Sequence, residues 1–417
     1  MTDTAPSSQP RTVTVALEVD GRPVEVADDG ITLLDALRDH LGVRSAKDGC
    51  SPQGQCGCCT VLVDGAPRVA CVTPLRRVAG RRITTVDGLE PEIAGAWAEA
   101  FAATGASQCG FCTPGIICRL EGARAKGVAA DDEAGVDRAL AAHLCRCTGW
   151  RPIHDAYALV AAPTTPSRPE RDLDAAARRA GIEGHAPQTV GPDVALGRGG
   201  FADDSAPADA LVAVPDGRGD WIVAETLAAA RRQAGKVQGR RTTVDPIPPL
   251  GLPAGDWAAA LRTCWVEPAY LEPDAAWCAP GAEPVGPLVN GGAFGGKRSS
   301  PVASAARTLA DRTGRPVRVL LAREDVVRLG PKRPPVAGGV DADGRGVLRI
   351  VATTGAAAAV ARVAPDLRVE EVDSPGPPTD AGLRAAGWAE AAMLLAAVRG
   401  LRPVAGLDGG EAEAAID

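Results

Sequence analysis

Two short cysteine motifs carry the clearest chemistry in this sequence. One is a Cys-x2-Cys pair, Cys109 and Cys112, and the other is a Cys-x-Cys pair, Cys145 and Cys147. Four thiolates can hold zinc or a [2Fe–2S] cluster. A one-residue gap is unusual for a structural zinc site, so the spacing favours an iron–sulfur cluster. Spacing this tight is rarely accidental, which disfavours four unrelated buried cysteines.

The residues beside these motifs predict helices that position the thiols. Thr113 supplies a capping hydroxyl and Pro114 suits the first helical position, so a helix is predicted to start there. Thr148 is predicted to cap the next helix. Thiolates at helix starts suit a metal centre that carries negative charge, because free backbone N–H groups point toward it.

A second cysteine group lies earlier in the chain, in a glycine-rich loop over residues 47–59. Its pattern is close to the plant-type [2Fe–2S] loop, C-x4-C-x2-C with a distant fourth cysteine, but the first gap is one residue longer. We favour Cys59 over its neighbour Cys58 because Cys59 preserves the x2 gap and directly precedes a predicted strand. A zinc ribbon is the alternative, although zinc ribbons favour two similar Cys-x2-Cys knuckles. The predicted ligands are Cys50, Cys56, Cys59 and Cys71.

The composition is that of a globular protein large enough for two or three domains. The chain has 417 residues, of which 23% are charged and 45% hydrophobic, with a formal net charge of −7. That charge argues against nucleic acid as the main partner. No apolar run reaches the length of a membrane span, and residues 1–10 do not resemble a signal peptide. Without an export signal, the 12 cysteines predict metal binding in the cytoplasm and not disulfides.

Hydrophobic periodicity and turn residues predict the elements that surround the cysteines. Alternating apolar residues predict strands, and Asp20-Gly21 and Asp64-Gly65 predict turns between them. Thr32 to Asp35 resembles a capping box at a helix start. The predicted strands are 13–19, 24–26, 60–63, one ending at Cys71, and 83–86; the predicted helices are 32–41, 91–103 and 153–160.

Residues 11–160 resemble the iron–sulfur part of the xanthine dehydrogenase/aldehyde oxidase family of molybdenum hydroxylases. The resemblance includes Gln108-Cys-Gly-Phe-Cys-Thr-Pro-Gly115 and Leu144-Cys-Arg-Cys-Thr-Gly149. It implies a ferredoxin-like β-grasp [2Fe–2S] domain over 11–87 and a four-helix [2Fe–2S] domain over 88–162. It further implies that electrons leave a molybdenum centre, cross the helical cluster and then the ferredoxin-like cluster, and reach a flavin or other acceptor. In this family the glutamine at Gln108 lies against the pterin of the molybdenum cofactor.

Beyond a predicted linker over 163–190, residues 191–417 resemble a compressed α/β part of a molybdopterin-binding domain. The overall prediction is therefore an α+β fold. The matching fragments keep the family's order. They are the strand-like 200–204, a βα segment from Ile222, the buried strand motif 270–273, the loop 291–297 similar to GGGFGGK, and Arg384-Ala-Ala-Gly387, similar to an active-site R-x-x-G loop. The resemblance implies cofactor contacts by Phe294, Gly295 and Arg384. From the residues alone, the glycines would let backbone N–H groups approach an anion, or form only a turn between strands.

Departures from the family argue against independent catalysis by this chain. The span between Pro273 and Gly291 is short, and most of the region that carries the family's base glutamate is absent. Glu411 is the one weak candidate for a general base, which a molybdenum hydroxylase needs. The prediction is an electron-transfer component with two [2Fe–2S] clusters, in which any contact with molybdopterin is shared with a partner chain. A molybdenum-binding catalytic chain and an FAD-binding chain are the expected partners.

Two other functions remain open. One is a self-contained molybdopterin-dependent oxidoreductase with a reduced cofactor domain. The other is a non-enzymatic [2Fe–2S] redox carrier.

Overall fold

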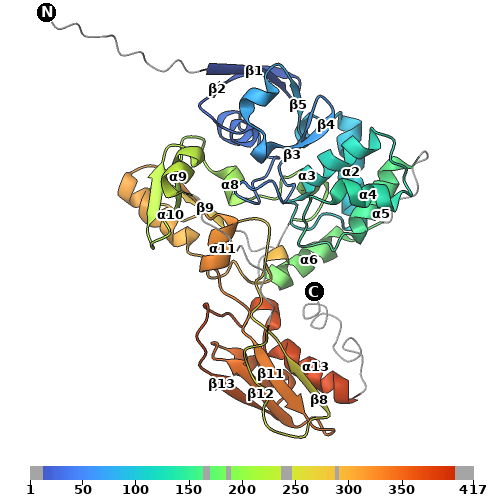
Figure 1. Cartoon of the computed structure of the whole chain (residues 1–417), viewed down its shortest axis with the longest axis vertical. Helices are drawn as coiled ribbons and strands as arrows, with labels where there is room; N and C mark the ends of the chain where they lie inside the picture. Colours follow the sequence, from blue (N-terminus) through green and yellow to red (C-terminus); the bar gives the residue numbers. More distant parts are fainter. Residues whose placement is uncertain (1–12, 163–169, 185–188, 236–246, 287–290, 400–417) are drawn as a thin grey trace, which may run out of the picture.

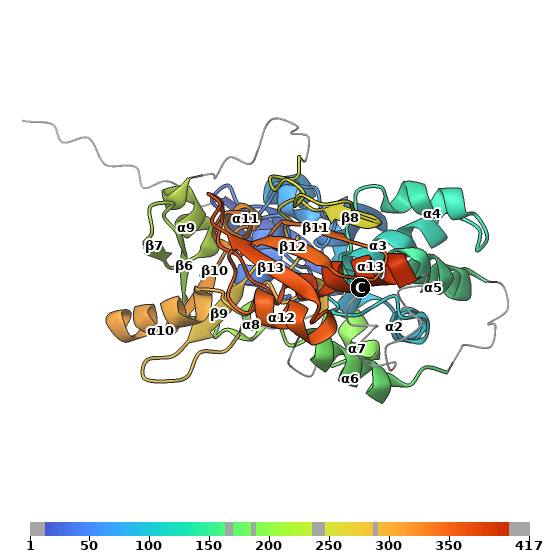
Figure 2. The same cartoon turned by 90° about the horizontal axis from the view of Figure 1, so that it is seen from below.

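The computed structural model describes residues 13–162, 170–184, 189–235, 247–286 and 291–399. These residues form a mixed structure of helices and three β-sheets. Figure 1 shows the N-terminal sheet at the top, the helices α2 to α5 beside it, and two further sheet units below. In the view from below, the last sheet unit lies in front of the rest of the molecule (Figure 2). None of the described helices is long and apolar enough to cross a membrane.

The first sheet has five strands in the order β2-β1-β5-β3-β4. Strand β1 alternates buried and exposed residues, with Val15, Leu17 and Val19 facing the core, as its period-two pattern predicts. Asp20 and Gly21 both have positive φ and make the tight turn to β2. The strand predictions are confirmed here, except that the fifth strand is shorter than expected and that the strand predicted to end at Cys71 ends at Val69, with Cys71 in a 3-10 turn. The strands are β1 Val13–Val19, β2 Arg22–Asp28, β3 Thr60–Val63, β4 Ala66–Val69 and β5 Arg82–Thr84.

The predicted capping box at Thr32 is present. The Asp35 amide donates to Thr32 Oγ1 at 3.2 Å, and the Thr32 amide donates to Asp35 Oδ2 at 2.9 Å. The helix that follows is α1 (Leu33–Asp35), which continues as a π-helical turn over Ala36–His40.

Four helices follow, and an aromatic cluster packs between them. Trp97 and Tyr157 are fully buried, and Trp97 Nε1 donates to Glu121 Oε2 at 2.9 Å. The prediction of Thr113 as an N-cap is wrong, because Thr113 lies inside the helix and donates to Ser107 Oγ at 3.2 Å. The helices are α2 Pro91–Thr104, α3 Thr113–Arg124, α4 Glu133–Leu140 and α5 Arg151–Ala161.

The predicted cap at Thr148 is also wrong. Trp150 precedes α5 with φ of 76°, and the Thr148 hydroxyl lies 3.1 Å from Cys145 Sγ. A local contact with the sulfur three residues earlier therefore replaces the capping bond.

Helix α3 joins the helices to the first sheet in one continuous core. Strand β3 is buried along its whole length, and α3 packs against it. A Cβ on Gly115 would lie 2.2 Å from the Gly57 carbonyl oxygen, so only glycine allows the start of α3 to approach the cysteine loop. The apolar core extends from the first sheet through α5 without interruption.

The segment expected to be a linker contains regular structure. Helix α6 (Leu173–Gly184) lies within it. Helix α6 packs near the turn Gly291–Ala293, and the short helix α7 (Pro192–Ala195) packs against α2. The chain after α5 thus stays attached to the iron–sulfur half.

Residues 191–399 form two sheet units with separate cores. The first has the strand order β7-β6-β10-β9 and the second β13-β12-β11-β8. The elements of the first are β6 Leu211–Pro215, β7 Trp221–Ala224, α9 Leu227–Ala234, β9 Ala275–Cys278, α10 Val302–Thr313, β10 Val317–Leu320 and α11 Arg323–Leu329. Those of the second are β8 Ala259–Arg262, β11 Val336–Val340, β12 Gly346–Val351, α12 Ala356–Val363, β13 Leu367–Val372 and α13 Trp388–Arg399.

Two strand expectations in this region are wrong. The segment 200–204 leads into a short helix, α8 (Ala202–Ser205), and its two aspartates enter an ion-pair network. The segment 270–273 is buried but irregular, and strand β9 begins after it. The βα segment from Ile222 is confirmed as β7 followed by α9.

Candidate functional site

The structure brings the two later cysteine motifs together as two sulfur pairs. Cys109 Sγ lies 3.4 Å from Cys147 Sγ, and the Cys112 thiol hydrogen-bonds Cys145. Cys112 is the residue before α3, so its pair lies at a helix start. The hydrogen bond from Cys112, with help from Thr148, outweighs burial and lowers the pKa of Cys145 to about 6. One thiol of this pair therefore has the thiolate character that an iron ligand needs.

The earlier cysteines form a second buried group. The Cys50 thiol hydrogen-bonds those of Cys56 and Cys71, and these bonds hold the pKa of Cys50 far below its usual range. Cys71 also interacts with Cys59, whose sulfur accepts the Cys71 amide at 3.4 Å. Cys58 is equally buried, but its thiol contacts the thiol of Cys56 and, at 3.8 Å, the Cys56 carbonyl, with no bond to Cys71. Cys59 is therefore tied to the distant cysteine of the group, and Cys58 is tied to the loop itself.

Backbone N–H groups face the sulfurs of both groups. The Gln53 amide donates to Cys50 Sγ at 3.3 Å, and the Cys147 and Thr148 amides donate to Cys145. Such donors stabilise the negative charge of thiolates bound to iron. Among the described residues, no three His, Cys, Asp or Glu side chains are arranged to hold a single metal ion. Paired thiols instead fit a two-iron cluster with four cysteine ligands.

A single backbone hydrogen bond connects the two groups. The Leu144 amide, beside Cys145, donates to the Cys56 carbonyl at 2.9 Å. His143 is buried next to this bond, and its Nε2 lies 2.9 Å from Thr60 Oγ1. Burial, with a smaller contribution from Arg119, lowers the pKa of His143 to about 4, so the imidazole is neutral at pH 7. His143 thus packs between the groups, as a residue that orients ligand loops would.

Gly57 determines how closely these two loops can approach. Its φ is +73°, and a Cβ there would lie 2.4 Å from the His143 ring and 2.8 Å from the Ala142 carbonyl oxygen. We expect Gly57→Ala to separate the loops and to lower the free energy of unfolding. The positive φ contributes about 1–2 kcal/mol to this loss, and the steric overlap of the new Cβ contributes a further 1–3 kcal/mol. Chemical unfolding and iron content measure the effect.

Gly80 provides the matched control for Gly57. It has a similar φ of +70°, but a Cβ there would meet nothing within 4 Å. Gly80→Ala should therefore lower the free energy of unfolding only by the contribution of the backbone conformation, and the variant should keep its iron. Equal losses in the two variants would show that the loop contact at Gly57 is unimportant.

Phe294, in the glycine-rich loop, contacts two guanidinium groups. Arg384 stacks 3.9 Å from the ring centroid and Arg146 lies 5.2 Å from it. Arg146 separates Cys145 from Cys147 in the sequence, and its Nε donates to the Pro268 carbonyl at 3.0 Å. The loop therefore contacts the segment of the later cysteine pairs directly, and cation–π attraction supports this contact.

The other predicted cofactor residues are placed as follows. Gly295 has φ of +90°, and a Cβ there would lie 3.0 Å from the Gly382 carbonyl oxygen, so this glycine allows the loop to meet the turn that carries Arg384. Gln108 is half-buried, directly before Cys109. Glu411 lies outside the described residues. Sequence reasoning missed Arg146, although it is part of the motif that carries the resemblance.

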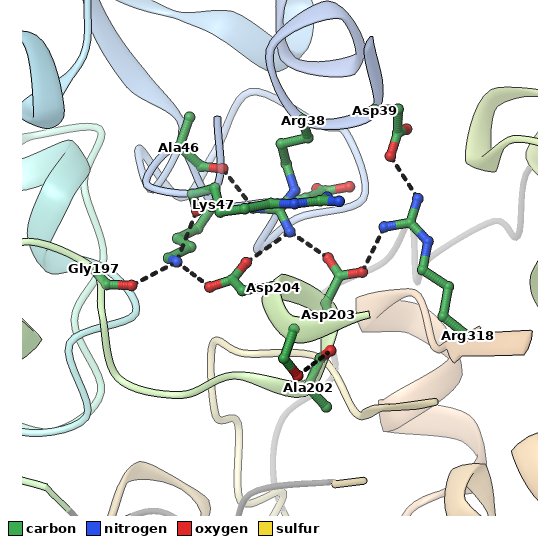
Figure 3. A network of polar contacts seen from close by, with 12 residues as sticks. Arg38, Asp39, Ala46, Lys47, Gly197, Ala202, Asp203, Asp204 and Arg318 are labelled. Carbon is green, nitrogen blue, oxygen red and sulfur yellow. Dashed lines mark hydrogen bonds and ion pairs between the residues drawn. The ribbon is translucent and has the colours of Figure 1, made fainter. Parts of the chain in front are cut away.

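A buried ion network joins the cysteine half to the rest of the chain (Figure 3). Arg38 donates to Asp203 at 2.6 Å and to Asp204 at 2.9 Å. Arg318 of β10 donates to the other oxygen of Asp203 at 2.9 Å and to Asp39 at 2.5 Å. Burial alone would raise the pKa of Asp203, but Arg38 and Arg318 outweigh it and hold that pKa well below its usual range. Asp203 is therefore ionised and shared by both halves.

Further polar contacts hold the second half against the cysteine loop. Lys47 is almost fully buried and binds Asp204 and the Gly197 carbonyl. Arg231 of α9 donates to Asp48 at 2.7 Å. Sequence analysis missed this interface. The local sequence gives little indication of it beyond two adjacent aspartates, Asp203 and Asp204, that follow Phe201.

The fold and the paired thiols define a protein with two iron–sulfur sites attached to a further α/β region. Sequence families support each part. A 2Fe-2S iron–sulfur cluster binding domain matches residues 17–76, a [2Fe-2S] binding domain matches 85–158, and a molybdopterin cofactor-binding domain matches 288–370. Two [2Fe–2S]-binding domains are therefore present.

Curated relatives identify the family. The nicotinate dehydrogenase small FeS subunit of Eubacterium barkeri is 36% identical over 146 residues, which cover 34% of this chain and 92% of that protein. Caffeine dehydrogenase subunit gamma of a Pseudomonas species is 36% identical over 155 residues, 36% of this chain and 92% of that protein. Aldehyde oxidoreductase of Megalodesulfovibrio gigas is 41% identical over 145 residues, 34% of this chain but 16% of that protein. The chain belongs to the molybdenum hydroxylase family.

The fold of nearly the whole chain resembles a solved structure. Aldehyde oxidoreductase from Desulfovibrio gigas superposes with a TM-score of 0.65 at 21% identity, over 94% of this chain and 62% of that chain. The chain thus spans less than two thirds of that structure, and a small fraction of the full-length relatives it matches.

Proposed function

We propose that this chain is the iron–sulfur electron-transfer component of a molybdenum hydroxylase. In this proposal Cys109, Cys112, Cys145 and Cys147 hold an inner [2Fe–2S] cluster. A second set, Cys50, Cys56, Cys59 and Cys71, holds an outer one. Electrons pass from a molybdenum centre to the inner cluster, then to the outer cluster, and on to a flavin or other acceptor. The proposed domains are a β-grasp domain over 11–87, a four-helix domain over 88–162, a connection over 163–190 and a truncated molybdopterin-binding-like domain over 191–417.

The observation that carries this proposal is the direct link between the two cysteine groups. The bond from the Leu144 amide to the Cys56 carbonyl, at 2.9 Å, joins residues within one position of a proposed ligand on each side. The sulfurs themselves are buried or half-buried. The path between the two groups is therefore short and lies largely away from solvent.

The second half supports a contact with a cofactor shared by a partner. Gln108, Phe294, Gly295 and Arg384 are the proposed contact residues, and Arg146 links them to the inner cysteines. Bound molybdopterin would supply the molybdenum that exchanges electrons with substrate. Two guanidinium groups lie against the Phe294 ring, so this loop is suited to hold an anion more than to bind an uncharged substrate. We therefore assign the second half to docking a catalytic chain.

The proposed partners are a molybdenum-binding catalytic chain and an FAD-binding chain. Several relatives with high coverage are themselves named as subunits of dehydrogenases, which supports an assembly of separate chains. The abundance of free cysteines suits the reducing cytoplasm, which we propose as the location.

Reductive titration of the chain purified alone tests this function. We expect the full chain to take up about two electrons, one for each [2Fe–2S] cluster, and to pass them to an added flavin. It should not oxidise an aldehyde or a purine by itself. Turnover of either substrate by the isolated chain would favour a self-contained oxidoreductase and contradict the proposal.

A further inference from the structure

A groove of about 770 Å³ lies between the first sheet and the segment 196–205. Its lining includes the partly exposed apolar side chains of Val24, Leu41 and Val43 together with polar and charged groups. Its volume falls in the range typical of sites for small organic ligands. None of the eight proposed cluster ligands lines it, so it is separate from the centres described above.

The ion network beside the groove is balanced within itself, and Arg44 lies outside it. The network of Figure 3 contains three cations, Arg38, Lys47 and Arg318, and three carboxylates, Asp39, Asp203 and Asp204. Arg44 lines the groove beside this network but forms no salt bridge with any described residue. Burial, followed by the nearby charge of Arg38, lowers its pKa. An anion in the groove would complete the balance of charge.

The acids that line the groove are already engaged. Asp20 accepts hydrogen bonds from the amide and hydroxyl of Thr85 at 2.7 and 2.9 Å. Asp87 lies 3.8 Å from Arg198, and Asp204 belongs to the buried network. These carboxylates are therefore poor partners for Arg44.

Two polar groups at the base of the groove lack hydrogen bonds. Within the described residues, the hydroxyl of Ser45 and Nη1 of Arg44 have no partner, and Ser45 is only 5% exposed. A buried hydroxyl without a partner costs free energy. Rotation about one side-chain bond can redirect the Ser45 hydroxyl, so it can donate to an oxygen that Arg44 also binds.

We propose that this groove binds an organic phosphate, a small molecule with a phosphate group and an apolar body. The phosphate lies against Arg44 and Ser45, since arginine binds phosphate oxygens in pairs. The apolar body lies against Val24, Leu41 and Val43. The proposal depends on the groove alone and not on the electron-transfer function.

Binding of 1-naphthyl phosphate to the iron-loaded full chain tests the proposal by fluorescence titration. The comparison compounds are 1-naphthol, which lacks the phosphate, and inorganic phosphate, which lacks the ring. We expect 1-naphthyl phosphate to bind at least tenfold more tightly than either compound. Arg44→Gln should weaken its binding tenfold or more, as loss of a charge-assisted bond predicts, and Ser45→Ala about threefold.

Two further variants separate binding from folding. Arg44→Lys keeps the charge but loses the paired hydrogen bonds, so its affinity should fall between that of the unmodified chain and that of Arg44→Gln. Arg76→Gln, an exposed arginine away from the groove, should bind like the unmodified chain. Visible circular dichroism of the clusters reports whether each variant is folded. Equal binding of naphthol and naphthyl phosphate, unchanged binding in a folded Arg44→Gln chain, or no binding at millimolar concentration would each overturn the proposal.

Discussion

Replacing Cys59 by alanine should lower the iron content of the chain from about four to about two atoms. Cys59 accepts the amide of Cys71 and interacts with its thiol, so its sulfur faces the other members of the outer group. Loss of one of four thiolates removes the outer cluster and leaves the inner one. Iron analysis, with the visible spectrum of the remaining cluster, measures the change.

Cys58 is the matched control, because it is adjacent and equally buried at 1% exposure. Its thiol contacts the thiol and the carbonyl of Cys56 and not Cys71. Cys58→Ala should therefore retain about four iron atoms. If Cys58→Ala lost the outer cluster and Cys59→Ala kept it, the ligand assignment would have to be exchanged between these neighbours.

Replacing Asp203 by alanine should detach the second half from the cysteine half. Asp203 bridges Arg38 and Arg318, which are only 6% and 8% exposed at their side chains. Without Asp203, both guanidinium groups stay buried with less negative charge to balance them, and the free energy of unfolding should fall by roughly 3–5 kcal/mol. Limited proteolysis should release fragments after α5, and chemical unfolding should show a lower midpoint.

Asp343 offers an exposed comparison, since it pairs with Arg345 where both side chains are more than two-thirds exposed. Asp343→Ala should change neither proteolysis nor unfolding, because exposed ion pairs contribute little. A similar response in both variants would mean that the network in Figure 3 does not hold the halves together.

The same network predicts a dependence on pH. The folded-state pKa of Asp203 is lowered, so its contribution to stability is complete above the ordinary aspartate pKa of about 4. The contribution is lost as the pH falls through the folded-state value. The Asp203→Ala chain should therefore lose less stability than the unmodified chain on acidification below about pH 4.

Features set by neighbouring residues could be predicted from the sequence, and features set by distant contacts could not. The alternation of β1 and the capping box of Thr32 depend on local pattern, and both are present. Thr113 and Thr148 satisfy the same capping rules, but their hydroxyls contact Ser107 and Cys145 instead, side chains whose positions the folded cysteine loops determine. Local propensity is a weak prior where such contacts compete.

The candidate site also has a part that could be predicted from local sequence and a part that could not. Cysteine spacing identified two groups, because ligand loops are short, and the structure brings each group together. The segment with Asp203 was expected to be a strand, but its partner Arg38 lies 165 positions away in the sequence. A helix that presents two aspartates to distant arginines leaves no local pattern by which to predict it.

Metal analysis of the chain purified alone tests the central claim most directly. An electron-transfer component with two [2Fe–2S] clusters predicts about four iron atoms for each chain and no molybdenum. Four iron atoms with stoichiometric molybdenum would show that the second half is a complete cofactor domain, and would contradict its assignment as a docking region for a catalytic partner.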